Sequence, residues 1–134
     1  MSNSIATGVA YADPEFTTCY ATVEIGYSTA AQGTVTQLTS KSTGVTLNKS
    51  SGQITMNNAA LLNGAIISFT LTNSLLSVRD VLIINVSGGL ATNGTYTSFV
   101  SNVATGTAVI SLYNISTGSL SEAVVLNFAI IHGQ

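Results

Sequence analysis

The sequence predicts an all-β fold, an antiparallel β-sandwich of jelly-roll type with eight or nine strands and an extended N-terminal arm. Val, Ile and Thr are abundant, and β-branched side chains fit the pleated, half-buried surface of a sheet. Short runs of such residues are separated by turn dipeptides such as Asn63-Gly64, Asn93-Gly94 and Thr105-Gly106. Helical periodicity extends over one turn at most. Short, closely spaced strands of this kind are typical of sandwiches and jelly rolls.

The candidate strands follow one another closely along the chain. They are Tyr20–Ile25, Thr34–Leu38, Gly44–Leu47, Gln53–Met56, Ile66–Thr72, Val81–Val86, Thr95–Val103, Ala108–Asn114 and Val124–Ile131. A single helical turn is expected at Asn58–Leu62, with Asn57 or Asn58 as its N-cap.

Two patterns of burial are expected among these strands. In 66–72, Ile67, Phe69 and Leu71 alternate with polar residues, which predicts one buried face. Val81–Ile84 and Val124–Leu126 are continuously apolar, which predicts burial on both faces. The surplus apolar face could lie beneath the N-terminal segment, in a subunit interface, or in an aggregate. We favour the interface, and with it a homotrimer, because the chain has few charges to protect exposed strand edges.

The charge content is the most unusual feature of the composition. The 134 residues are enough for one domain, and only 6% are charged, against about 25% in ordinary soluble domains. Ser, Thr and Asn, numbering 17, 19 and 11, must supply most of the polar surface. The three cations, Lys41, Lys49 and Arg79, cannot form the basic stripe that nucleic acids or anionic membranes require. We therefore expect neither as a partner.

Localisation signals are equally sparse. No apolar run approaches the roughly 20 residues that cross a bilayer, and the N-terminus lacks the pattern of a secretory signal. The lone cysteine, Cys19, has no intramolecular partner, so assembly in a reducing cytoplasm is expected. An intermolecular disulfide through Cys19 is the alternative left open.

The N-terminal segment differs in composition from the rest, which divides the chain into an arm and linker (1–32) and a sandwich domain (33–134). The arm holds the only proline, in the extended dipeptide Asp13-Pro14, and it ends in a small-residue linker, Ser28–Gly33. Its aromatic residues Tyr11, Phe16 and Tyr20 are the candidate anchors for a capsid. The competing interpretation makes the same segment one or two further strands of the sandwich.

Residues suited to catalysis are nearly absent. The only imidazole, His132, lies at the C-terminus, where we expect a solvated, frayed side chain rather than a positioned base. Asp13 and Glu15 could bind a hard cation only weakly, and Arg79-Asp80 is interpreted as a turn with edge charges. The prediction is a protein without enzymatic activity, cofactor or metal.

Several blocks of the sequence carry a resemblance to a known family. They are Gly33–Gln37, Thr39–Lys49, Gly52–Met56, Ser68–Ser74, Gly118–Ala123 and Leu126–Ile130. In this order, over about residues 33–133, they resemble a domain of tailed-bacteriophage virion proteins that are described as tail fibre, head fibre or capsid decoration. The resemblance implies a symmetric, trimeric, β-rich building block with no enzymatic residues to transfer. It does not extend to residues 1–32.

Together, the resemblance and the short chain favour a capsid decoration (cement) protein. It would be assembled in the host cytoplasm, lie on the outer face of the virion shell, contact the major capsid protein and stabilise the capsid. The alternative is a small head-fibre or tail-fibre tip whose loops bind a host surface receptor or glycan through Tyr and Asn side chains.

Overall fold

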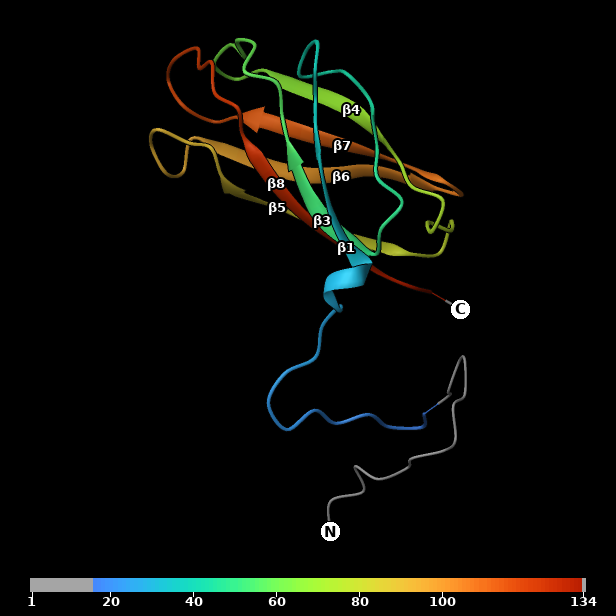
Figure 1. Cartoon of the computed structure of the whole chain (residues 1–134). Coiled ribbons are helices and arrows are strands. Elements are labelled where there is room, and N and C mark those ends of the chain that lie inside the picture. The colour runs from blue at the N-terminus through green and yellow to red at the C-terminus, as the bar shows by residue number, and fades with distance from the viewer. Residues whose placement is uncertain (1–15, 134) are drawn as a thin grey trace.

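The computed structural model describes residues 16–133, which form a two-layer β-sandwich with a segment extending from one end (Figure 1). The predicted all-β sandwich is confirmed. Eight strands are present, preceded by one short 3-10 helix, η1 (Thr29–Ala31). Of the candidate capsid anchors, Tyr11 lies outside the described residues.

Each layer is a four-stranded sheet, and the chain passes from one sheet to the other after every strand except β6, which is followed by β7 in the same sheet. The first sheet has the order β1-β3-β8-β5 and the second the order β2-β4-β7-β6. The strands are β1 (Gln32–Thr36), β2 (Val45–Thr46), β3 (Ser51–Thr55), β4 (Ile66–Thr72), β5 (Val81–Gly88), β6 (Tyr96–Ala104), β7 (Thr107–Asn114) and β8 (Val125–Ile131).

The pairing is not antiparallel throughout. The pairs β3–β8, β5–β8, β4–β7 and β6–β7 are antiparallel, whereas the pairs β1–β3 and β2–β4, at one edge of each sheet, are parallel. The chain crosses from β1 in the first sheet to β2 in the second and back to β3, so neighbours in one sheet are joined by a crossover instead of a hairpin. Among the strands of residues 16–133, only the consecutive β6 and β7 form a hairpin, and its turn contains Gly106 with φ +79°.

The core lies between the sheets and is built from the alternate residues that face inwards. Ile54 of β3 is paired with Leu126 of β8, and Phe69 of β4 with Ile110 of β7; all four are buried. In β4 the burial alternates as the sequence predicted, with Phe69 and Leu71 inside and the intervening Ser and Thr residues exposed. Truncating a core residue such as Leu126 to Ala would cost about 2–5 kcal/mol of unfolding free energy.

Two predicted elements are wrong. Residues 20–25 form no strand, and residues 16–133 contain eight strands, within the predicted eight or nine. No helical turn forms at 58–62; instead Leu61 and Leu120 exchange backbone hydrogen bonds of 2.8 and 3.1 Å in an isolated bridge. The Asn57 side chain, which was expected to cap a helix, accepts a bond from Ala59 N at 2.8 Å and makes a turn.

Candidate functional site

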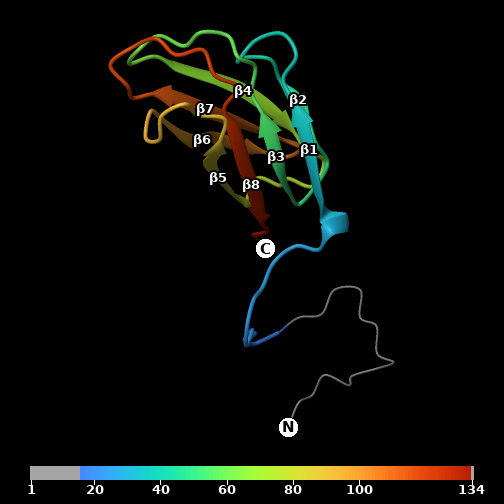
Figure 2. The same cartoon turned by 60° about the vertical axis from the view of Figure 1, so that its left-hand side comes forward.

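The described part of the arm, residues 16–28, runs away from the sandwich (Figure 2). It exposes large apolar side chains. Phe16 is 68% exposed and Tyr20 is 91% exposed. The structure therefore leaves these two predicted anchors available for a partner, without bringing them together on the sandwich. Two further apolar residues of the arm, Val23 and Ile25, are also exposed.

The base of the arm is fastened to the first sheet. The Tyr27 hydroxyl donates to the carbonyl of Ile130 in β8, and Gln32 Nε2 donates to the Tyr27 carbonyl at 3.0 Å. On the other side, Lys49 Nζ donates to the Ala30 carbonyl at 2.9 Å. The stretch 28–33, which the sequence predicts to be a small-residue linker, contains η1, the first residues of β1 and these hydrogen bonds, so it is held against the sandwich.

An apolar groove of about 570 Å³ lies between the base of the arm and the outer face of β5 and β8. It is lined by Ile25, Gly26, Tyr27, Ile83, Ala129, Ile130 and Ile131. Next to the groove lies Val81, which is paired with Ile131 and is 58% exposed. The run Val81–Ile84 was predicted to be buried on both faces. In the single chain its outer face is exposed, and only Leu82 is buried among the core residues.

The other half of the same outer face is polar and uncharged. The strand register places Thr34, Gln53, Asn127 and Asn85 in one row across β1, β3, β8 and β5. Gln53 Nε2 donates to Asn127 Oδ1 at 3.0 Å, which orders the middle of the row. These hydroxyl and amide groups can form neutral hydrogen bonds with a ligand, and none of them is charged.

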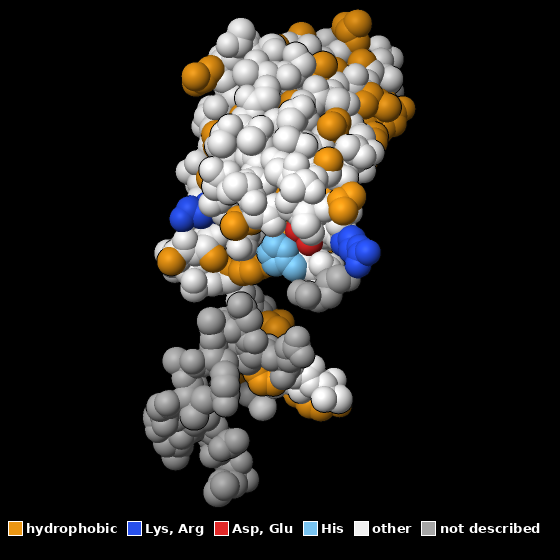
Figure 3. Space-filling model, turned by 90° about the vertical axis from the view of Figure 1, so that its right-hand side faces the viewer, with side chains coloured by type: hydrophobic (Ala, Val, Ile, Leu, Met, Phe, Trp, Pro, Cys, Tyr) orange, Lys and Arg blue, Asp and Glu red, His pale blue; other side chains and the backbone are white. Residues whose placement is uncertain are grey.

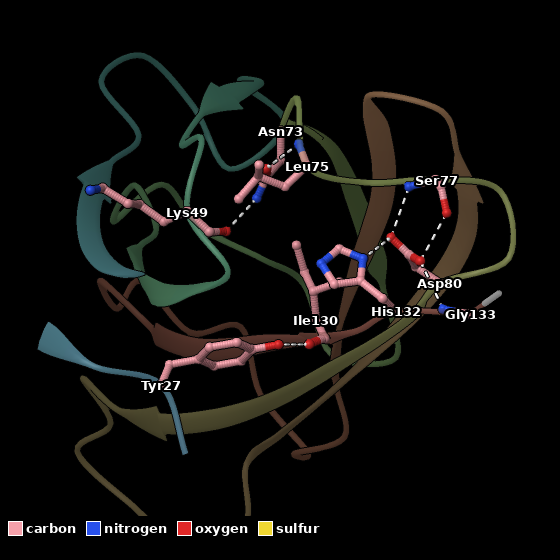
Figure 4. Close-up of polar contacts among 9 residues, drawn as sticks. All are labelled: Tyr27, Lys49, Asn73, Leu75, Ser77, Asp80, Ile130, His132 and Gly133. Atoms are coloured by element: carbon pink, nitrogen blue, oxygen red, sulfur yellow. Dashed lines mark hydrogen bonds and ion pairs between the residues drawn. The ribbon is translucent and has the colours of Figure 1, made fainter. Parts of the chain in front are cut away.

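At the end of the sandwich where the arm begins, a carboxylate holds the C-terminal segment (Figure 4). The buried Asp80 accepts bonds from Ser77 N and Ser77 Oγ, both at 2.8 Å, from Gly133 N at 3.0 Å and from His132 Nδ1 at 3.0 Å. These bonds, led by the one from the Ser77 amide, lower the pKa of Asp80 to about 2. We call this set, Ser77, Asp80, His132 and Gly133, the C-terminal clasp.

The clasp contradicts the expectation that His132 is frayed, although its side chain stays solvated, at 47% exposure. It also contains the residue types of a hydrolytic triad, but in a different arrangement. In a triad the serine is bonded to the imidazole, which takes its proton. Here Ser77 is bonded to Asp80 and the imidazole is bonded to the other carboxylate oxygen. This geometry holds chain segments together and gives Ser77 no base.

A second polar cluster joins the loops at the opposite end of the sandwich. Lys41 is 3% exposed, and its ammonium group donates to the carbonyls of Asn57 and Glu122. Burial lowers the pKa of Lys41, and the charge of Glu122 partly opposes this shift. The Glu122 carboxylate accepts from Ala91 N at 2.6 Å. Burial, together with this carboxylate, raises the pKa of Tyr96 to about 12, which keeps its phenol neutral. The cluster stabilises loops and leaves Lys41 inaccessible as a surface charge.

Comparison with known proteins finds no matching protein family, no matching curated protein and no matching solved structure. Within residues 16–133, no three His, Cys, Asp or Glu side chains are grouped as a metal site. No helix in that part of the chain is long and apolar enough to span a membrane.

Sequence reasoning missed two features of this region. Tyr27 has no sequence signal that separates it from the other arm tyrosines, because its role depends on the carbonyl of Ile130, 103 residues away. The apolar groove did have a signal, the uninterrupted run Val81–Ile84, but the sequence could not show which face of that run is left open.

Proposed function

We propose that the protein is a structural building block of a bacteriophage virion, a capsid decoration protein that attaches to the outer face of the shell through its arm. The observation that carries the proposal is the arm itself, which leaves the sandwich with Phe16 and Tyr20 exposed. Aromatic side chains of this kind contribute most of the binding energy when an interface buries them. An extended segment also covers a wide surface with few residues.

The distribution of charge supports a partner that is bound by shape and neutral contacts. Six charged residues lie within 16–133, and two of them, Lys41 and Asp80, are buried. Figure 3 shows one face of the molecule, which is mostly uncharged and polar, with the charged side chains at the end from which the arm leaves. A surface with so few charges suits a repetitive protein shell better than a polyelectrolyte.

The titratable groups of the described residues also fit a structural role. Asp80 and His132 form the clasp, and Lys41 and Glu122 join loops. Each of these groups is accounted for by a contact that stabilises the sandwich. We propose on this basis that the protein is not an enzyme.

A second candidate is a small head-fibre or tail-fibre tip that binds a host glycan. It is favoured by the uncharged polar row of Thr34, Gln53, Asn127 and Asn85. The first three of these residues line a shallow pocket of about 470 Å³. Amide and hydroxyl groups in a row match the neutral hydroxyls of a sugar chain. In this proposal the sandwich face makes the contact, and the arm attaches the tip to the virion.

Cosedimentation with empty capsids of the phage that encodes the chain tests the leading proposal. We expect full-length protein to sediment with the capsids, and a variant lacking residues 1–22 to stay in the supernatant while keeping its fold. Phe16→Ala combined with Tyr20→Ala should weaken binding at least thirtyfold, since one aromatic hot spot contributes about 2 kcal/mol or more. Leu38→Ala is the matched control, because Leu38 is an 84% exposed apolar residue outside the arm.

The outcome that contradicts the proposal is equally direct. If the variant lacking residues 1–22 binds capsids as well as the full chain, the arm is not the attachment device. If neither protein binds capsids but both bind host cells, and Asn127→Ala abolishes that binding, the fibre-tip candidate takes its place.

A further inference from the structure

The apolar groove at the base of the arm is too exposed to be explained by the single chain. Ile83 is 48% exposed and Ile131 is 55% exposed, and with Val81 they form a continuous apolar strip on the outer face of β5 and β8. Large exposed apolar patches on soluble domains mark interaction sites. The groove is also well defined, because the hydrogen bonds of Tyr27 to Ile130 and Gln32 fix the arm where it forms one wall.

The arm of the same chain also contains apolar side chains that are exposed to solvent. Val23 and Ile25, in the arm just before the groove, are 91% and 85% exposed. Ile25 lines the groove and still exposes most of its side chain, so the protein's own arm covers the groove only in part. Tyr27 is fastened and the arm leads away from the sandwich (Figure 2), and Val23 is not among the residues that line the chain's own groove.

We propose that the groove receives the proximal arm, Val23–Ile25, of a second copy of this chain. The inference rests on the proposed function only in expecting that copies assemble; it adds which surfaces meet. The groove wall and floor hold no charged side chain. The incoming segment has one, Glu24, and in an extended segment its side chain points away from those of Val23 and Ile25, towards water. The two surfaces therefore match in polarity.

The contact joins two different surfaces, because each copy supplies one arm and one groove. Two copies can exchange arms reciprocally about a two-fold axis, or each copy can pass its arm to the next in a heterologous, head-to-tail contact. Such a contact closes into a ring when the rotation permits it, and the predicted trimer is the smallest such ring. A standard interface buries about 800 Å² on each partner, more than a three-residue segment supplies. The exposed strip Val81, Ile83 and Ile131 must therefore join the same interface.

A cross-linking experiment with mixed copies tests the contact without any capsid. In a Cys19→Ser background, one population carries Thr22→Cys in the arm, and the other, which bears an N-terminal tag, carries Asn85→Cys next to Ile83 on β5. Thr22 and Asn85 are both exposed. A disulfide-linked dimer of one tagged and one untagged copy has a mass between those of the two homodimers. Its disulfide can only join two different copies. We expect it under mild oxidation, and we expect at least tenfold less when Thr97→Cys, an exposed position of β6 in the other sheet, replaces Asn85→Cys.

The association state supplies an independent readout. Val23→Asp, in the exposed arm, and Ile83→Asp, on the outer face of β5, should each convert the oligomer into a monomer in light scattering at micromolar concentration. Thr97→Asp should leave the oligomer intact. Val23→Asp should not unfold the sandwich, because Val23 is exposed and lies outside its strands. Loss of the oligomer in this variant therefore reports on the contact and not on folding.

Three results would overturn the inference. These are a monomeric wild-type protein, equal cross-linking to positions 85 and 97, and an oligomer that tolerates both Asp substitutions. Failure to bind capsids would leave the inference unaffected and count against the proposed function alone. Conversely, a monomer that still binds capsids through Phe16 and Tyr20 would support the proposed function and reject the groove contact.

Discussion

The imidazole of His132 lies 3.0 Å from the carboxylate of Asp80, and this contact fastens the end of the last strand to the loop before β5. β8 occupies an inner position of the first sheet, between β3 and β5, so its C-terminal end also borders the apolar groove and the base of the arm. One side chain, Asp80, thus stabilises the region from which the arm leaves. Because the clasp depends on the charged Asp80 carboxylate, we expect the free energy of unfolding to fall at acidic pH.

Asp80→Asn should lower the free energy of unfolding at neutral pH, and the difference from wild type should shrink as the pH falls from about 4 to about 2. The sign follows from the pKa of Asp80, which is about 2 in the folded protein, below its ordinary value of 3.8. Stability from a carboxylate of this kind is present above the ordinary value and is lost as pH falls through the folded one. Urea denaturation at several pH values measures the difference. Glu24→Gln, in the exposed arm, is the control, and a constant difference across this range would refute the role of Asp80.

Gly133→Ala should destabilise the clasp, whereas Gly118→Ala should leave stability nearly unchanged. A Cβ on Gly133 would lie 2.2 Å from the Arg79 carbonyl oxygen, which is backbone and cannot move aside cheaply. The Gly133 amide would then lose its bond to Asp80 Oδ1, which would keep only the bond from Ser77 Oγ. A Cβ on Gly118 meets nothing within 4 Å. Thermal unfolding of the two variants compares them directly; equal melting temperatures would show that the C-terminal segment is not held as described.

The raised pKa of Tyr96 predicts how the stability of the folded protein changes at alkaline pH. Its pKa is raised to about 12, chiefly by burial and also by the charge of Glu122. Because the folded pKa lies above the ordinary value of 10, stability from the neutral phenol is complete below pH 10 and is lost as the pH rises towards 12. Tyr96→Phe should therefore remove the last step of the tyrosinate absorbance titration and reduce the loss of stability in this range. Tyr20→Phe, which alters an exposed phenol, should do neither.

The parts of the fold that depend on local alternation could be predicted from the sequence, and the parts that depend on distant partners could not. The pattern of Ile67, Phe69 and Leu71 specified the buried face of β4, and the predicted range of that strand equals the observed one. The segment 20–25 has the same β-branched and aromatic composition, yet it forms no strand because no neighbouring strand pairs with it. Propensity describes whether a residue fits a sheet and does not supply the partner.

In the candidate site too, features that depend on local composition could be predicted, and features that depend on distant residues could not. Exposed aromatic residues in the arm were expected from composition alone, and Phe16 and Tyr20 are exposed. The clasp was not expected, because Asp80 and His132 are separated by 52 positions and are brought together only by the β5–β8 pairing. The buried state of Lys41 was missed for a similar reason, since its ammonium group is satisfied by two carbonyls that are distant in sequence.

Binding to capsids should depend only weakly on salt. Four of the six charged residues in the described part of the chain are not buried, and they are too few to build a strong complementary potential. Raising the salt from about 0.05 to 0.5 M shortens the Debye length roughly threefold, which would release a protein held by charge. We expect the apparent Kd to change less than about threefold, consistent with an interface of apolar and neutral polar contacts. Release from capsids at high salt would contradict this account of the interface.

Tyr27→Phe separates a fastened arm from an arm that is an integral part of the sandwich. The substitution keeps the ring in the apolar groove and removes only the hydroxyl that donates to the Ile130 carbonyl. A hydrogen bond of this kind contributes about 0.5–1.5 kcal/mol, so the base of the arm should open roughly three to ten times more often. Hydrogen exchange at the amides of residues 22–31 should accelerate by that factor. The melting temperature of the sandwich should stay unchanged, because β8 keeps its pairing with β3 and β5 on both sides.

Tyr113→Phe, in β7 of the other sheet, is the control and should leave hydrogen exchange in the arm unchanged. If Tyr27→Phe instead lowers the melting temperature of the whole domain, then the arm is part of the cooperative unit, and its base is not a separate fastening.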